Sequence, residues 1–275
     1  LQGNQTLMLV DGIRLNNSIF RYGPNQYLNT VDAFGLDQME VLFGNGAVQY
    51  GSDAMGGVIL AKFHEPETKN LNRWVPHFFV RGMSGQQERS ARGSIDYATA
   101  KFGLTLGGTL RNFGNIVAGG DQAQLTPTGY TERNFDGKFQ VYGKRGKWTF
   151  AHQNHNQFDV PIYHKVSLEN HAFYNMDLQL RSMTYLKKEW ANLMGALDKV
   201  EVVIGQQGQG EWRSFQKNGS SISRREKDSV DTRFVTLKVF GKQKKGFQYV
   251  MGLEGYFDHV FSQRVDWNQT SATQK

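Results

Sequence analysis

Histidine is the residue type in this sequence with the widest chemical use, because neutral imidazole binds both haem and metal ions. Four of the seven histidines gather around one stretch of chain: His152, His155, His164 and His171. On a strand, residues three apart face opposite sides, so His152 and His155 cannot hold one ion unless the strand ends between them. The four histidines are candidates for haem or metal contact, and solvated loop histidines are the alternative. We predict no resident metal site and no cofactor.

Motifs of the common catalytic and nucleotide-binding sites are absent or incomplete. The sequence contains neither Gly-x-Ser-x-Gly nor His-Glu-x-x-His. Gly44-Asn45-Gly46 follows an apolar run, but Gln49 stands where the dinucleotide-binding fingerprint needs glycine or alanine. No Gly-Lys-Ser/Thr follows, which excludes a P-loop. A tight turn is the better interpretation, and we predict no catalytic residues and no enzymatic activity.

Residues 15–28 are crowded with donors, acceptors and rings, which a ligand-contacting surface needs. These side chains belong to Asn16, Asn17, Arg21, Tyr22, Asn25, Gln26 and Tyr27. The alternative is a polar loop whose asparagines satisfy its own turns. A second group, Arg224, Arg225 and Lys227, could attract an anion, and a solvated run of charge is its alternative.

Two short apolar runs flank the polar stretch and must position it. Residues 7–10 end at Asp11-Gly12, and residues 39–43 end at Gly44-Asn45-Gly46, so each run reads as a strand followed by a turn. Glycine recurs at 51, 56 and 57, which predicts sharp turns and close backbone packing. Residues 1–61 are therefore predicted to form a compact domain of short strands.

A polar segment with two prolines, residues 62–76, predicts a linker. Beyond it, apolar and polar residues alternate; Tyr174, Met176, Leu178 and Leu180, for example, alternate with polar neighbours. This period of two predicts strands with one apolar and one polar face. We predict nine strands, at 76–86, 89–98, 102–113, 132–143, 147–157, 171–185, 199–213, 229–241 and 247–261.

After a tight first connection, short and long connections alternate between these strands. Short ones are predicted at 99–101, 144–146, 191–198 and 242–246, and long ones at 114–131, 158–170 and 214–229. Bacterial membrane barrels have this pattern of short periplasmic turns and long outer loops, with strands of about 9–11 residues. A soluble sandwich would also alternate, but strand length and loop parity favour the barrel.

Composition excludes several other classes of protein and site. The net charge of +7 permits a polyanionic partner, but no basic stripe interleaves with stacking aromatic residues, so nucleic-acid binding is not predicted. The absence of cysteine excludes a disulfide framework and a thiolate metal site. The sequence contains no run of eighteen apolar residues, so no transmembrane helix is predicted.

The N-terminal stretch resembles the C-terminal half of the plug domain of TonB-dependent outer-membrane receptors. The resemblance is carried by LVDGIRLNN at 9–17, FRYGPNQYLNTVD at 20–32 and MEVLFGNGAVQYGSDAMGGVI at 39–59. Asn45 stands where the family usually has proline, which a turn accepts. The segment AMGGVILAKFHEP at 54–66 also resembles the haem branch of this family, in which a Phe-His pair is frequent.

The resemblance implies an all-β dominated fold. Residues 1–61 would be the C-terminal part of an α+β plug domain, residues 62–76 a linker, and residues 77–275 the first nine strands of a 22-stranded antiparallel transmembrane β-barrel. It also implies that the sequence is a fragment that lacks its signal peptide, the TonB-contacting segment, the first half of the plug and the later strands.

The resemblance further implies TonB-dependent transport of a scarce ligand, of the iron-siderophore, haem or cobalamin type, across the bacterial outer membrane. The implied partners are the inner-membrane TonB-type energy-coupling complex, the ligand and outer-membrane lipid. The implied ligand-contacting residues are Arg14, Asn16, Asn17, Arg21, Tyr22, Asn25 and Tyr27. Two alternatives stay open: a passive porin-like or adhesive barrel, and a soluble all-β binding module or enzyme.

Overall fold

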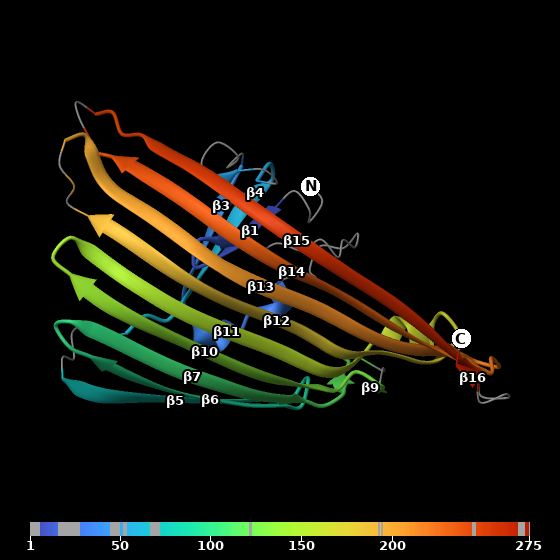
Figure 1. Ribbon diagram of the computed structural model, residues 1–275. Coiled ribbons are helices and arrows are strands. Elements are labelled where there is room, and N and C mark those ends of the chain that lie inside the picture. Colours follow the sequence, from blue (N-terminus) through green and yellow to red (C-terminus); the bar gives the residue numbers. More distant parts are fainter. Residues whose placement is uncertain are drawn as a thin grey trace.

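The protein is described here from a computed structural model, which contains two main β-sheets (Figure 1). The structure describes residues 6–15, 28–44, 50–51, 54–66, 72–120, 123–191, 193, 195–243, 246–268 and 273–274. Among these residues, no helix is both long enough and apolar enough to cross a membrane.

The first sheet, which we call the N-terminal sheet, has four strands in the order β2-β1-β4-β3. Their bounds are Thr6–Val10 for β1, Ile13–Arg14 for β2, Leu36–Phe43 for β3 and Gly57–Phe63 for β4. β1 pairs with β4 in parallel, and the other pairs are antiparallel. Two short 3₁₀ helices, η2 (Leu28–Thr30) and η3 (Ala33–Gly35), precede β3.

Tight turns shape this sheet, as the glycine pattern predicts. Asp11 and Gly12 join β1 to β2 with φ angles of 53° and 81°, the two positive values that a two-residue type I′ turn requires. Gly57 begins β4 with φ at 154°, and a Cβ there would lie 2.6 Å from the carbonyl oxygen of Leu42. Only glycine allows the β3 and β4 backbones to approach this closely.

The second sheet, which we call the long sheet, has ten strands in the order β16-β15-β14-β13-β12-β11-β10-β7-β6-β5, with every neighbouring pair antiparallel. Nine of them lie where the alternation predicts strands: β5 (Arg73–Met83), β6 (Glu88–Ala98), β7 (Phe102–Phe113), β10 (Tyr130–Gly143), β11 (Gly146–Pro161), β12 (His171–Ala191), β13 (Leu197–Lys217), β14 (Ile222–Gly241) and β15 (Val250–Asn268). The tenth, β16 (Thr273–Gln274), is a two-residue addition at the edge.

The connections follow the predicted alternation of short and long as far as β13. Long ones after β7 and β11 carry the small strands β8 (Ile116–Val117) and β9 (Gln124–Leu125) and the short helix α2 (Tyr163–Ser167). The prediction of a long loop at 214–229 is wrong. β13 and β14 extend into this range and are joined by residues 218–221 alone. Its polar side chains pair across the strands, as Arg213 does with Glu226 at 3.0 Å.

The long sheet buries its polar face and exposes its apolar face. On β10 the buried residues are Glu132, Asn134, Asp136, Lys138 and Gln140, while Phe135, Phe139 and Val141 alternate with them and are exposed. The N-terminal sheet lies against the long sheet on one side (Figure 1). An apolar cluster joins the two sheets at Met8, Val10, Ile13, Leu15, Val31, Ala61 and Phe63 on one side and Ala151, Met183, Tyr185, Val203 and Phe234 on the other.

Candidate functional site

The contact between the two sheets, which we call the sheet interface, is centred on the carboxylate of Asp11. This residue occupies the β1–β2 turn, so its side chain projects beyond the end of the N-terminal sheet. Oδ1 accepts hydrogen bonds from the Lys138 Nζ and the Phe63 backbone N–H, each at 3.0 Å. Oδ2 accepts from Gln153 Nε2 at 2.7 Å and from the Tyr185 hydroxyl at 3.2 Å. One carboxylate thereby links three successive strands, β10, β11 and β12.

The 3₁₀ segment adds a second set of polar links. Arg181 on β12 donates from Nε to the Thr30 carbonyl oxygen at 2.9 Å. Asn29 donates from Nδ2 to Gln179 Oε1 at 2.8 Å, and Gln157 Nε2 donates to the Asn29 carbonyl oxygen at 3.2 Å. These bonds fix the backbone that follows the predicted ligand-contacting stretch.

Arg92 on β6 forms the third link. Its guanidinium makes a two-pronged pair with Asp136 on β10, at 2.7 and 3.0 Å. The same Nη1 also donates to Thr109 Oγ1 at 3.1 Å and lies 3.5 Å from Oδ2 of Asp32, the residue before η3. Because Arg92, Asp32 and Asp136 are all buried, this group is screened little by solvent.

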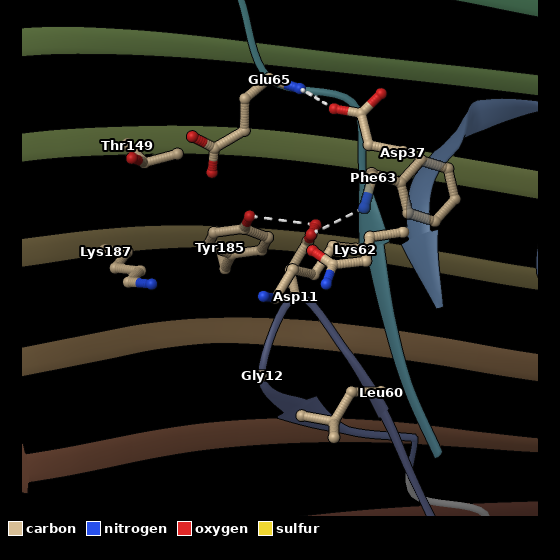
Figure 2. Close-up of a pocket in the computed structure, with 11 residues that line it drawn as sticks. Asp11, Gly12, Asp37, Leu60, Lys62, Phe63, Glu65, Thr149, Tyr185 and Lys187 are labelled. Carbon is tan, nitrogen blue, oxygen red and sulfur yellow. Dashed lines mark hydrogen bonds between the residues drawn. The ribbon is translucent and has the colours of Figure 1, made fainter. Parts of the chain in front are cut away.

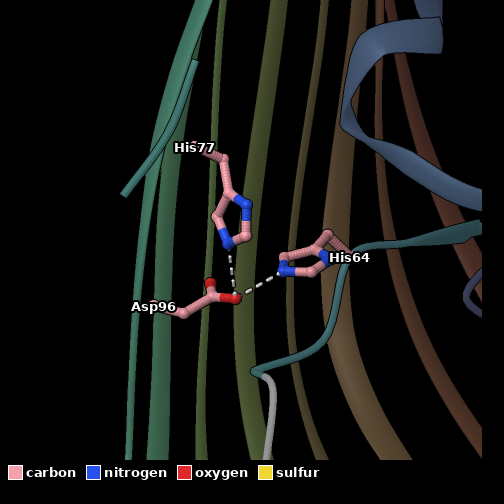
Figure 3. A group of neighbouring side chains, drawn as sticks. All are labelled: His64, His77 and Asp96. Carbon is pink, nitrogen blue, oxygen red and sulfur yellow. Dashed lines mark hydrogen bonds and ion pairs between the residues drawn. The ribbon is translucent and has the colours of Figure 1, made fainter. Parts of the chain in front are cut away.

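Three side chains meet where the N-terminal sheet passes into the long sheet, and we call them the junction cluster: His64, His77 and Asp96 (Figure 3). His64 follows β4 directly, His77 lies on β5 and Asp96 on β6. The Asp96 Oδ2 lies 2.7 Å from His64 Nε2 and 3.3 Å from His77 Nε2. On the far side of the ring, His64 Nδ1 lies 2.6 Å from Asp37 Oδ1.

The two carboxylates favour the charged form of His64. Its hydrogen bond to Asp96 is the main cause, and together with the bond to Asp37 it raises the pKa of His64 to about 9 against the opposing effect of burial. Next to it, burial alone would raise the pKa of Glu65, but the neighbouring ammonium groups of Lys147 and Lys138 hold it below the usual value. The chain that follows β4 is thus held to the long sheet by two charged contacts, His64 with Asp96 and Glu65 with Lys147.

A cavity of about 380 Å³ opens between the two sheets beside these groups. Asp11 and Gly12 border it from the β1–β2 turn, Asp37 from β3, Glu65 from the chain after β4, and Tyr185 and Lys187 from β12 (Figure 2). Its lining carries both signs of charge, so the cavity can accommodate water and a polar group rather than an apolar ligand.

The structure describes one of the seven predicted ligand-contacting residues. Arg14 lies on β2, its carbonyl oxygen accepts from Gln207 Nε2 at 3.1 Å, and its guanidinium carbon lies 5.8 Å from the Tyr256 ring centre. The other six, Asn16, Asn17, Arg21, Tyr22, Asn25 and Tyr27, lie outside the described residues.

The four histidines singled out in the sequence do not share one group. His152 and His155 lie on β11, with His152 bonded to Thr184 at 2.8 Å and His155 buried. His164 lies on α2, and His171 starts β12 and contacts the Lys165 carbonyl oxygen at 3.2 Å. Sequence reasoning missed the junction cluster, because His64, His77 and Asp96 have no motif spacing; the Phe63-His64 pair was its one signal.

Comparison with known proteins agrees with this architecture. Residues 1–58 match the family model described as TonB-dependent Receptor Plug Domain. The vitamin B12 transporter BtuB of Vibrio vulnificus (strain YJ016) is 44% identical over 72 residues, which cover 26% of this chain and 10% of that protein. The ferric aerobactin receptor of Klebsiella pneumoniae is 25% identical over 150 residues, which cover 52% of this chain and 19% of that receptor.

Solved structures share the fold at low sequence identity. The copper transporter OprC matches with a TM-score of 0.77 and 13% identity over 98% of this chain and 42% of its own. The pyoverdine outer membrane receptor FpvA from Pseudomonas aeruginosa PAO1 matches with a TM-score of 0.66 and 12% identity over 94% of this chain and 40% of its own. The chain therefore spans less than half the length of each of these proteins.

The proteins that match are named as receptors and transporters. The predicted all-β fold, a plug followed by an open part of a β-barrel, is confirmed. Residues 1–58 thus match the plug domain of TonB-dependent receptors, and the chain as a whole shares the fold of solved outer-membrane receptors and transporters.

Proposed function

We propose that this protein transports a scarce ligand across the bacterial outer membrane, with energy delivered by a TonB-type inner-membrane complex. The observation that carries the proposal is the seating of the plug, the N-terminal sheet with η2 and η3, on the buried polar face of the barrel sheet. A plug held in this way obstructs the route along that face, so passage requires that it be displaced.

The exposed face of the barrel sheet supports the membrane location. Its large apolar side chains include Phe78 at 77% exposed, Phe257 at 68% and Leu110 at 63%. Soluble proteins rarely expose so continuous an apolar surface, whereas membrane barrels turn this face to lipid and their polar face to the lumen. This pattern argues against a soluble binding module.

The chemistry of the interface supports an energised mechanism over passive flow. Breaking the Asp11–Lys138 pair would leave buried charges unpaired, which costs several kcal/mol by the usual measure of such pairs. Thermal motion rarely supplies enough energy to break several such plug–barrel contacts at the same time. Work applied to the plug through a TonB contact would supply it, whereas a passive porin-like barrel needs no such closure.

The ligand class follows from the relatives' names as a proposal. Relatives by sequence are a vitamin B12 transporter and ferric aerobactin receptors, so we propose cobalamin or an iron-siderophore as the cargo. Haem stays a third candidate, which rests on the resemblance of residues 54–66 alone. Contact would come from Arg14, Asn16, Asn17, Arg21, Tyr22, Asn25 and Tyr27, which provide donors and aromatic faces in one short stretch.

Uptake by whole cells tests the proposal. A strain that lacks its own receptors for these ligands is given the complete receptor, and entry of labelled cobalamin, ferric siderophores and haem is measured with and without TonB. We expect one ligand class to accumulate only when both the receptor and TonB are present. Equal uptake without TonB would support the passive barrel and overturn the proposal.

A further inference from the structure

We propose that the junction cluster binds a divalent metal ion of the Zn²⁺ type, held by His64 Nε2, His77 Nε2 and an oxygen of Asp96 (Figure 3). The three ligand atoms all lie within 4.8 Å of one another. None of its three residues belongs to the predicted ligand-contacting stretch, and the proposal holds whichever ligand the receptor transports.

Two atoms of the cluster are buried without a hydrogen-bond partner. Asp96 is 1% exposed and its Oδ1 has no partner, and neither has His77 Nε2, although that nitrogen lies 3.3 Å from Asp96 Oδ2. Leaving a buried polar atom unsatisfied costs about 1–3 kcal/mol. A cation placed between the imidazoles and the carboxylate would give His77 Nε2 a partner, and a carboxylate that binds it through both oxygens would also satisfy Oδ1.

Asp37 already holds His64 in the orientation that a metal ligand needs. Its Oδ1 lies 2.6 Å from His64 Nδ1, and its Oδ2 accepts from the Glu65 backbone N–H at 3.2 Å. Metal-binding histidines almost always bond a carboxylate or carbonyl oxygen through the ring nitrogen that faces away from the metal. Asp37 therefore directs Nε2 of His64 toward Asp96 and His77.

The donor set selects among metals. Two imidazole nitrogens and one carboxylate oxygen suit Zn²⁺ and similar transition ions, whereas Ca²⁺ and Mg²⁺ prefer oxygen ligands throughout.

The separation of the ligand atoms is the second test of the site. Ligands about 2.0–2.1 Å from a tetrahedral ion lie roughly 3.3 Å from each other. The distance of 3.3 Å from Asp96 Oδ2 to His77 Nε2 matches this value, the distance of 2.7 Å to His64 Nε2 is shorter, and all three ligand atoms lie within 4.8 Å, so side-chain rotations would complete the site. His77 is partly exposed, which leaves a path for the ion and room for water as a fourth ligand.

The metal would join three parts of the chain. His64 is the first residue after the last plug strand, and His77 and Asp96 lie on the first two strands of the barrel sheet. An ion shared among them would hold the end of the plug to the barrel wall while the rest of the plug moves. The site would thus be a structural metal site that links the plug to the barrel.

Zn²⁺ binding to the complete receptor tests the proposal. The receptor is purified in detergent, stripped with a chelator and titrated with Zn²⁺ by calorimetry, and Co²⁺ absorption is recorded as a second readout of imidazole coordination. We expect His77→Ala to abolish one Zn²⁺ site and the matching Co²⁺ bands. We expect Asp37→Asn, which removes only the orienting carboxylate, to weaken Zn²⁺ binding about 10- to 100-fold.

His259→Ala is the matched control, because this histidine is exposed on β15 and lies outside the cluster. It should leave the site unchanged. Since Asp96 is buried, Asp96→Asn can disturb folding, so the partly exposed His77 carries the test. Wild type that binds no more Zn²⁺ than His77→Ala would overturn the proposal, as would an equal loss in His259→Ala.

Discussion

Asp11 of the plug and Lys138 of the barrel sheet form a buried ion pair, with 3.0 Å between Oδ1 and Nζ and side chains 6% and 4% exposed. The two residues are 127 positions apart in the sequence. Lys138 also donates to the Phe63 carbonyl oxygen at 2.7 Å, so one ammonium group holds both the first turn of the plug and the end of its last described strand. The pair is therefore the central polar tie between plug and barrel.

Replacing Lys138 with methionine should loosen the plug. The apolar side chain fills a similar space but leaves Asp11 as a buried, uncompensated charge, for which breaking a buried pair costs about 3–5 kcal/mol. We expect a lower temperature or denaturant midpoint for plug unfolding, measured by calorimetry of the receptor in detergent.

The double variant Asp11→Asn with Lys138→Met is the control for this effect. With both charges removed, the stability loss should be smaller than the sum of the two single losses. Strict additivity of the two single changes would show that the pair does not act as a unit.

Phe135→Arg should prevent stable insertion of the barrel. Phe135 lies in the middle of β10, is 47% exposed and belongs to the apolar face. An arginine facing the middle of a bilayer costs about 2–4 kcal/mol, whereas Phe135→Leu keeps the surface apolar. Folding into lipid vesicles, followed by heat-dependent gel mobility, measures the difference. If the arginine variant folds as well as the leucine variant, this face does not meet lipid.

The plug–barrel junction should weaken at alkaline pH in receptor stripped of metal. The pKa of His64 is raised from its usual 6.5 to about 9, mainly by the hydrogen bond to Asp96, so the charged ring stabilises the folded state. This contribution is complete below pH 6.5 and is lost as the pH rises through about 9. The plug-unfolding midpoint of wild type should therefore fall over this range relative to His64→Gln, whose side chain does not titrate. Parallel curves for the two proteins would contradict the assignment.

Replacing Arg21, Tyr22 and Asn25 together with alanine should weaken ligand binding without affecting the plug's seating. These side chains supply a charge, a ring and an amide in the predicted contact stretch, whereas the described interface uses other residues. We expect at least about a tenfold loss of affinity, in line with removing a few direct contacts. Unchanged affinity in a correctly folded variant would place the contact elsewhere.

The strands could be predicted from sequence because each carries its own signal. The alternation around Tyr174 and Leu178 is complete within one strand, and the Asp11-Gly12 turn is equally local. The loop predicted at 214–229 is a misreading of the same signal: Arg224 and Lys227 look like solvated loop charges, yet Arg224 pairs with Asp266 on the adjacent strand at 2.8 Å.

The interface could not be predicted, since it depends on which distant residues the curved sheet brings together. Lys138 and Gln153 look like ordinary polar-face residues until the plug turn places Asp11 between them. The junction cluster likewise needs the β5–β6 register, which sets Asp96 opposite Val75 and so two residues from His77. Neither set of residues has a spacing that a sequence pattern could reveal.

The conductance of the complete receptor in a planar lipid bilayer tests the central claim most directly. A receptor whose plug is seated on the polar face should show no open channel without energy input, and a variant lacking the whole plug domain up to Phe63 should conduct ions through a wide pore. An intact receptor that conducts as freely as the deletion variant would contradict the account.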